Sequence, residues 1–148
     1  MEPAMSDVPG YNFGDPQLPT SPVSLDDFRL LEATVLWSDG DEAALRRAGE
    51  ILIPQTEAIL DLWYGFVGSH AHLVSSFAGS DGAPDGAYLS AVRARFARWI
   101  ADVCTRDRDQ TWLDHQHELA LRHHHTKKNA TDGIASTSAA SKANGGRS

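Results

Sequence analysis

The sequence predicts an all-α fold, and three observations lead to that prediction. Apolar residues recur at spacings of three and four in several segments, as they do along one face of a helix. The alternating pattern of a half-buried strand is found nowhere in the sequence. Hydrophobic residues make up 41% of the 148 residues, which suffices for a single core and a single domain.

Residues 1–23 are expected to form an extended N-terminal arm. Five of the seven prolines lie there, among few aliphatic side chains. Tyr11 and Phe13 are the aromatic residues that can pin this arm to the rest of the domain.

Two helices are expected next. Ser24 can cap the first, with acidic residues in its opening turn, and the pair Asp39-Gly40 is expected to end it. The second is expected over residues 41–53. Their expected inward positions are Leu25, Phe28, Leu31 and Val35 in the first, and Ala44, Leu45, Ala48, Ile51 and Leu52 in the second.

Beyond Pro54 the pattern predicts a third helix over residues 55–68 and a short helical piece over 72–77. A loop rich in turn residues, 79–86, separates them from a long helix over 87–105. The expected inward positions are Ile59, Leu60, Trp63, Phe66 and Val67 in the third helix, and Leu89, Val92, Phe96, Trp99, Ile100 and Val103 in the long one.

The last expected helix, residues 112–128, reads WLDHQHELALRHHHTKK and places His123 at the centre of an apolar face. At about 100° per residue, Trp112, Gln116, Leu119 and His123 fall in one narrow stripe. An imidazole turned toward apolar side chains needs a partner, because burying an unpaired polar group costs free energy. That partner can be a haem iron, or a backbone carbonyl or carboxylate that accepts a hydrogen bond.

The sequence gives little support to a nucleic-acid-binding, membrane or enzymatic function. The net charge of −7 disfavours a nucleic-acid partner. No apolar run approaches the roughly 18 residues of a membrane span, and no secretory signal is recognisable, so a cytoplasmic protein without a membrane partner is expected. The lone cysteine, Cys104, fits a reducing compartment. No nucleophile–base pair, phosphate loop or paired-carboxylate site is recognisable, so the protein is not expected to be an enzyme.

Four motifs follow one another between about residue 8 and residue 133: VPGYNFGDP, LDLWYGFVGSHAHL, YLSAVRARFARWIADVC and WLDHQHELALRHHHTKKNATD. In this order they resemble protoglobins and the globin domains of globin-coupled sensors. The resemblance implies a globin-like helical fold with an extra N-terminal helix over residues 24–133. It also implies that the domain binds haem b and takes oxygen, carbon monoxide or nitric oxide at the iron.

Carried over by position, the resemblance implies roles for four residues. His123 looks like the proximal iron ligand, and Trp63 and Tyr64 look like distal residues. Phe96 looks like a wall of the distal side. These roles suit the residue types, since a tyrosine hydroxyl can donate to bound oxygen and large rings keep a pocket dry.

The resemblance ends near residue 133, where relatives continue into two more long helices. Residues 134–148 are instead small and polar, and we expect them to form a disordered tail. The expected fold therefore lacks the final two helices. Apolar surface that those helices would bury is expected to favour self-association or a homodimer.

The sequence thus predicts a haem-binding domain that reversibly binds oxygen or another diatomic gas, for storage or for sensing. The alternative is a degenerate globin remnant without haem that acts as a helical interaction domain. Absorbance distinguishes the two, because histidine-bound haem gives an intense Soret band.

Overall fold

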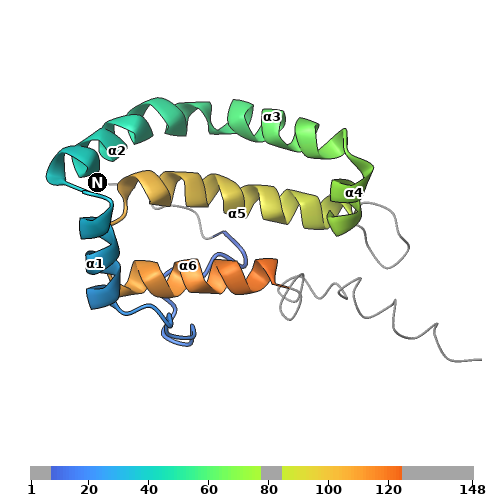
Figure 1. The fold of residues 1–148 in the computed structure, drawn as a ribbon. Helices are drawn as coiled ribbons and strands as arrows, with labels where there is room; N and C mark the ends of the chain where they lie inside the picture. The colour runs from blue at the N-terminus through green and yellow to red at the C-terminus, as the bar shows by residue number, and fades with distance from the viewer. Residues whose placement is uncertain (1–7, 78–84, 125–148) are drawn as a thin grey trace, which may run out of the picture.

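The computed structural model describes residues 8–77 and 85–124, and the regular elements in these ranges are all helices, which confirms the all-α prediction. In Figure 1, α5 lies between an arch formed by α2 and α3 and the helix α6, while α1 closes one end. The elements are α1 (Leu25–Thr34), α2 (Asp39–Leu52), the 3-10 turn η1 (Ile53–Gln55), α3 (Thr56–Gly68), α4 (Ala71–Val74), the 3-10 turn η2 (Ser75–Phe77), α5 (Gly86–Thr105) and α6 (Gln110–His123). Within the described ranges, none of these helices has the length and apolar character needed to cross a bilayer.

Short polar side chains begin several helices, as their capping chemistry predicts. Ser24 caps α1 by accepting a hydrogen bond from the backbone N–H of Asp27 at 3.1 Å, which confirms the predicted start. Asp85 and Asp109 cap α5 and α6 in the same way. The prediction for α2 was wrong at its start, because its first turn includes Asp39 and Gly40.

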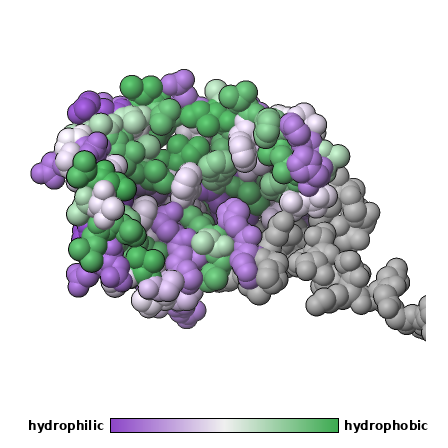
Figure 2. Space-filling view, viewed as in Figure 1, coloured by the Kyte–Doolittle hydropathy of each residue, from purple (hydrophilic) through white to green (hydrophobic). Residues whose placement is uncertain are grey.

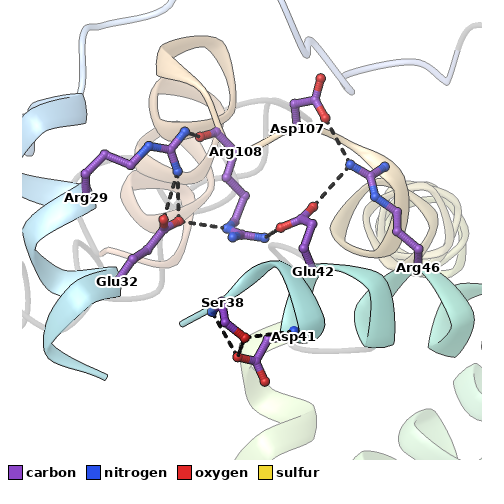
Figure 3. Close-up of polar contacts among 8 residues, drawn as sticks. All are labelled: Arg29, Glu32, Ser38, Asp41, Glu42, Arg46, Asp107 and Arg108. Carbon is purple, nitrogen blue, oxygen red and sulfur yellow. Dashed lines mark hydrogen bonds and ion pairs between the residues drawn. The ribbon is translucent and has the colours of Figure 1, made fainter. Parts of the chain in front are cut away.

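The cause of that early start is a capping box. The Ser38 hydroxyl accepts from the backbone N–H of Asp41, and the Asp41 carboxylate accepts from the backbone N–H of Ser38 at 3.0 Å (Figure 3). Two backbone donors without helical partners are thereby satisfied. The helical pattern of apolar residues does not reveal such a box, because its members are both polar.

The buried apolar residues come from α3, α5 and α6. They are Leu60 and Val67 of α3, Cys104 of α5 and Leu113 of α6. Gly49 of α2 is buried against Cys104 so closely that a Cβ atom at Gly49 would lie 2.7 Å from the Cys104 Cβ. The absence of a side chain at Gly49 therefore lets α2 and α5 approach each other.

Several positions predicted to point inward are exposed instead. They are Leu31, Val35, Ala44, Ile51, Leu52, Trp63 and Phe66. For Trp63 and Phe66 the reason is that α3 buries the side that carries Leu60 and Val67, whereas its apolar stripe is wider. Figure 2 shows the resulting apolar surface over the arch of α2 and α3 and over α1.

An ion-pair network holds α1 and α2 to the turn before α6 (Figure 3). Arg108, whose side chain is only 12% exposed, bonds Glu32 of α1 at 3.1 Å and Glu42 of α2 at 2.6 Å. Burial alone would raise the pKa of Glu42, but Arg108 and Arg46 reverse the effect and hold that pKa below its ordinary value. Glu42 therefore stays charged in the network at neutral pH.

Candidate functional site

His123 occupies the last turn of α6, and its ring is exposed, so the prediction that it is buried among apolar side chains was wrong. Its Nδ1 atom lies 2.7 Å from the backbone oxygen of Leu119, one turn earlier. A carbonyl oxygen can only accept, so Nδ1 carries the hydrogen in this bond. In the neutral ring the lone pair is then on Nε2, the atom that faces away from the helix backbone and can bind a metal.

The side of α6 that carries His123 faces α5. Trp99 of α5 donates its indole N–H to Gln116 of α6 at 3.2 Å. His123 follows Gln116 by seven residues, which is two helical turns, so both side chains lie on nearly the same side of α6. The two helices run in opposite directions (Figure 1). The stretch of α5 two turns before Trp99 carries Val92 on the same side of the helix.

Phe96 adjoins this stretch and is half-buried. Its ring contacts the Trp99 ring, with centroids 5.8 Å apart. Phe96 follows Leu89 by seven residues, so it shares the side of α5 on which Leu89 lines a cavity. α5 therefore carries apolar side chains on two adjoining sides, one toward α6 and one toward the cavity.

That cavity lies between α3, the α4–η2 segment and α5, and its volume is about 510 Å³. A volume of this size lies within the usual range for small-molecule and cofactor sites. It is lined mainly by apolar side chains, with one phenol and one guanidinium: Tyr64, Val67, Gly68, Val74, Phe77, Leu89, Ser90 and Arg93. Of the four predicted site residues, Tyr64 is the one among these lining residues.

Tyr64 is half-buried, and its ring packs edge-on against Phe77 with centroids 6.3 Å apart. Burial raises the pKa of its hydroxyl, and the positive charges of Arg93 and Arg95 oppose that rise only in part. The hydroxyl therefore keeps its proton at neutral pH and can donate a hydrogen bond into the cavity.

Arg93 is held in place at the edge of the cavity. Its guanidinium bonds Glu57 at 2.7 Å and Asp61 at 2.8 Å, both on α3, and lies 6.0 Å from the centre of the Tyr64 ring. Arg93 therefore links α5 to the part of α3 that precedes Tyr64.

Trp63 lies apart from the other predicted site residues. Its side chain is 47% exposed and stacks on Phe66, with centroids 6.1 Å apart, on the outer side of α3. Of the four predicted site residues, the structure thus brings Tyr64 to the cavity. Phe96 packs against Trp99, His123 lies exposed at the end of α6, and Trp63 lies on the outer side of α3.

The donor set fits a haem. A haem iron takes its equatorial ligands from the porphyrin and needs one helical imidazole from the protein. A ligating histidine almost always donates its other N–H to a carbonyl or carboxylate, which fixes the ring, and His123 has this arrangement with Leu119. Among residues 8–77 and 85–124, no three histidine, cysteine or acidic side chains are grouped as a direct metal site.

Comparison with known families shows that the sequence model of the Protoglobin family matches residues 24–134. The matched range begins at the cap of α1 and contains all six α-helices, together with Tyr64, Phe96 and His123. No curated protein matches the chain.

Proposed function

This chain belongs to the protoglobin family, and from that premise we propose that it binds haem b through His123 and reversibly binds a diatomic gas. Oxygen, carbon monoxide and nitric oxide are the candidate gases. The proposed role is storage or sensing in the cytoplasm rather than catalysis of a reaction.

One observation carries the proposal. The hydrogen bond from His123 Nδ1 to the Leu119 carbonyl leaves Nε2 as the ring atom that can reach an iron. An imidazole held in this way could ligate the iron, and a bound haem would supply the gas-binding chemistry.

The other residues are proposed to shape the surroundings of the haem. Phe96 is proposed to form an apolar wall on the distal side, where it would limit the entry of water. The half-buried Tyr64 hydroxyl keeps its proton and can donate a hydrogen bond to a gas ligand that carries partial negative charge.

Titration of the purified chain with haem tests the proposal. We expect a Soret band that saturates at one haem per chain, and a five-coordinate, histidine-ligated spectrum in the ferrous state. His123→Ala should abolish or greatly weaken this spectrum, whereas the neighbouring His124→Ala should retain it. A chain that shows no saturable Soret band would refute the proposal.

A second candidate function rests on the exposed apolar side chains. Leu62, Trp63 and Phe66 of α3 are exposed together with several large residues of α1. Exposed apolar side chains of this kind are typical of an interaction face. A helical interaction domain without haem is therefore the alternative, and a negative haem titration combined with partner-dependent protection of α1 and α3 from hydrogen exchange would favour it.

A further inference from the structure

His115 of α6 is completely buried, with 0% of its surface exposed, yet neither ring nitrogen has a hydrogen-bond partner among the described residues. Two aromatic rings of the N-terminal arm, here residues 8–23, cover it. Tyr11 and Phe13 meet its ring edge-on, with centroids 4.7 Å and 5.2 Å away. A buried polar ring without partners costs free energy, so the arm closes over a side chain that favours water.

Charged groups from α5 and α6 surround this ring. On α5, Asp102 accepts the Tyr11 hydroxyl hydrogen at 2.7 Å and lies 3.3 Å from Arg98 Nε and 3.2 Å from Arg106 Nε. On α6, Glu118 pairs with Arg122 at 3.2 Å. The N-terminal arm adds one titratable group to these surroundings, the Tyr11 hydroxyl.

Burial has the largest effect on the pKa of His115. It lowers the pKa of His115 to about 4; Arg122 and Arg106 act in the same direction, and Asp102 and Glu118 oppose them. The imidazole is therefore neutral at pH 7 while the arm is closed.

The same arm is bonded to the last turn of α6. Arg122 donates to the Gly10 carbonyl at 2.7 Å and to the Asn12 side-chain oxygen at 2.9 Å. Arg122 directly precedes His123 in the chain. Farther along the arm, the backbone N–H of Ser21 donates to Asp114 of α6 at 2.8 Å.

We propose that the N-terminal arm is an acid-released clamp on α6: protonation of His115 drives Tyr11 and Phe13 off the helix and frees Arg122 beside His123. The ring can hold a proton at little cost only when the arm has opened and water reaches it. The clamp is a property of the polypeptide itself and does not depend on the proposed haem.

Acid favours opening of the arm because the pKa of His115 is higher in the open state than in the closed one. With the arm open, the pKa of His115 returns to its ordinary value of about 6.5. Above that pH both states hold the neutral ring, so pH has no effect through this group. Below it, the open state binds the proton first, and each unit of acidification favours opening about tenfold until the pH reaches about 4. The equilibrium constant for opening rises about 300-fold in total.

Hydrogen exchange of the arm amides in the haem-free full chain tests the clamp. After correction for intrinsic exchange rates, protection factors in residues 8–23 should fall about thirtyfold between pH 7.5 and pH 5.0. His115→Phe fills the same space and loses no hydrogen bond, so its arm should stay protected within about threefold. His117→Phe, two residues away on α6, is the matched control and should lose protection like the unaltered chain.

Nuclear magnetic resonance of the unaltered chain gives a second measurement that does not depend on the variants. The His115 ring should titrate well below pH 6.5, and the arm resonances should shift with the same midpoint. A His115 ring that titrates near pH 6.5, an arm that stays protected at pH 5.0, or equal loss of protection in His115→Phe would overturn the proposal.

Discussion

At His123 a single hydrogen bond decides which ring nitrogen can bind a metal. The Leu119 carbonyl engages Nδ1 at 2.7 Å and also fixes the rotation of the ring. The His123 side chain is nevertheless exposed in the described structure. Its proposed role therefore rests on orientation and family membership rather than on burial.

Tyr64→Phe tests the distal role at the same scale. The variant keeps the ring that packs against Phe77 and removes only the hydroxyl. Loss of one hydrogen bond to bound oxygen, worth about 0.5–1.5 kcal/mol, should raise the oxygen dissociation rate several-fold in stopped-flow measurements. Tyr88→Phe, which removes a hydroxyl from α5 outside the lining of the cavity, should leave that rate unchanged. Equal rates for Tyr64→Phe and the unaltered chain would contradict the role.

Residue identity could be predicted from the sequence, but residue environment could not. The motifs pointed to Tyr64, Phe96 and His123, whereas the outward position of Trp63 depends on which side of α3 the other helices cover. His115 was missed because it lies outside the apolar stripe of α6. Its burial comes from the arm, which joins it from about a hundred positions away in the chain.

Among the elements, α1 ends in a strained conformation. Leu36 has φ of 59° in the Schellman motif that ends the helix, with its N–H bonded to Ala33 and the Trp37 N–H bonded to Glu32. Its side chain is 83% exposed, so little packing offsets the strain.

Leu36→Gly should therefore stabilise the protein by about 1 kcal/mol, because glycine adopts this backbone conformation without the clash of a Cβ atom. Urea unfolding measures the change. Leu30→Gly, in the interior of α1, is the matched control and should destabilise by about 1 kcal/mol. Destabilisation by both substitutions would contradict the strain at Leu36.

The packing of α2 on α5 gives a second prediction for the elements. Gly49→Ala would place a Cβ atom 2.7 Å from the Cys104 Cβ, so the helices must move apart. Overpacking of this kind should cost about 1–3 kcal/mol in the free energy of unfolding. Gly65→Ala in α3 meets no atom within 4 Å and should instead stabilise by about 0.5–1 kcal/mol. An unchanged midpoint of urea unfolding for Gly49→Ala would show that Gly49 and Cys104 are less closely packed than described.

The order and the approximate limits of the helices were predictable, because helical periodicity and capping residues are local signals. The start of α2 was predicted too late, because the Ser38–Asp41 box is built from polar side chains that a search for apolar periodicity passes over. The last helix was predicted to extend beyond His123 to residue 128, but His124 already has extended backbone and ends α6. Residues 125–128 lie outside the described ranges.

At the scale of the whole molecule, the exposed apolar side chains predict association between copies. Leu62 of α3 is 78% exposed and lies beside two exposed aromatic residues, and α1 presents a second group. Sedimentation velocity should show a sedimentation coefficient that rises with concentration. Leu62→Glu should reduce this rise, whereas Ala43→Glu, which adds the same charge to an exposed site of α2, should not. A monomer at every concentration would contradict the prediction.

Which apolar surfaces are exposed could not be predicted from composition. Helices α1, α2 and α3 each carry an apolar stripe. The sequence pattern that predicts such a stripe does not predict how much of it a neighbouring helix covers. The close contact between Gly49 and Cys104 and the wide stripe of α3 together set that coverage, and both arise from tertiary packing.

Chemical rescue tests the central claim most directly, since it asks whether the iron ligand is the imidazole of His123. His123→Gly removes the ring and leaves space for a free imidazole. The account predicts that ferrous haem mixed with this variant gives no five-coordinate histidine spectrum, and that added imidazole restores it. If the variant gives that spectrum without imidazole, another residue holds the iron and the account is contradicted.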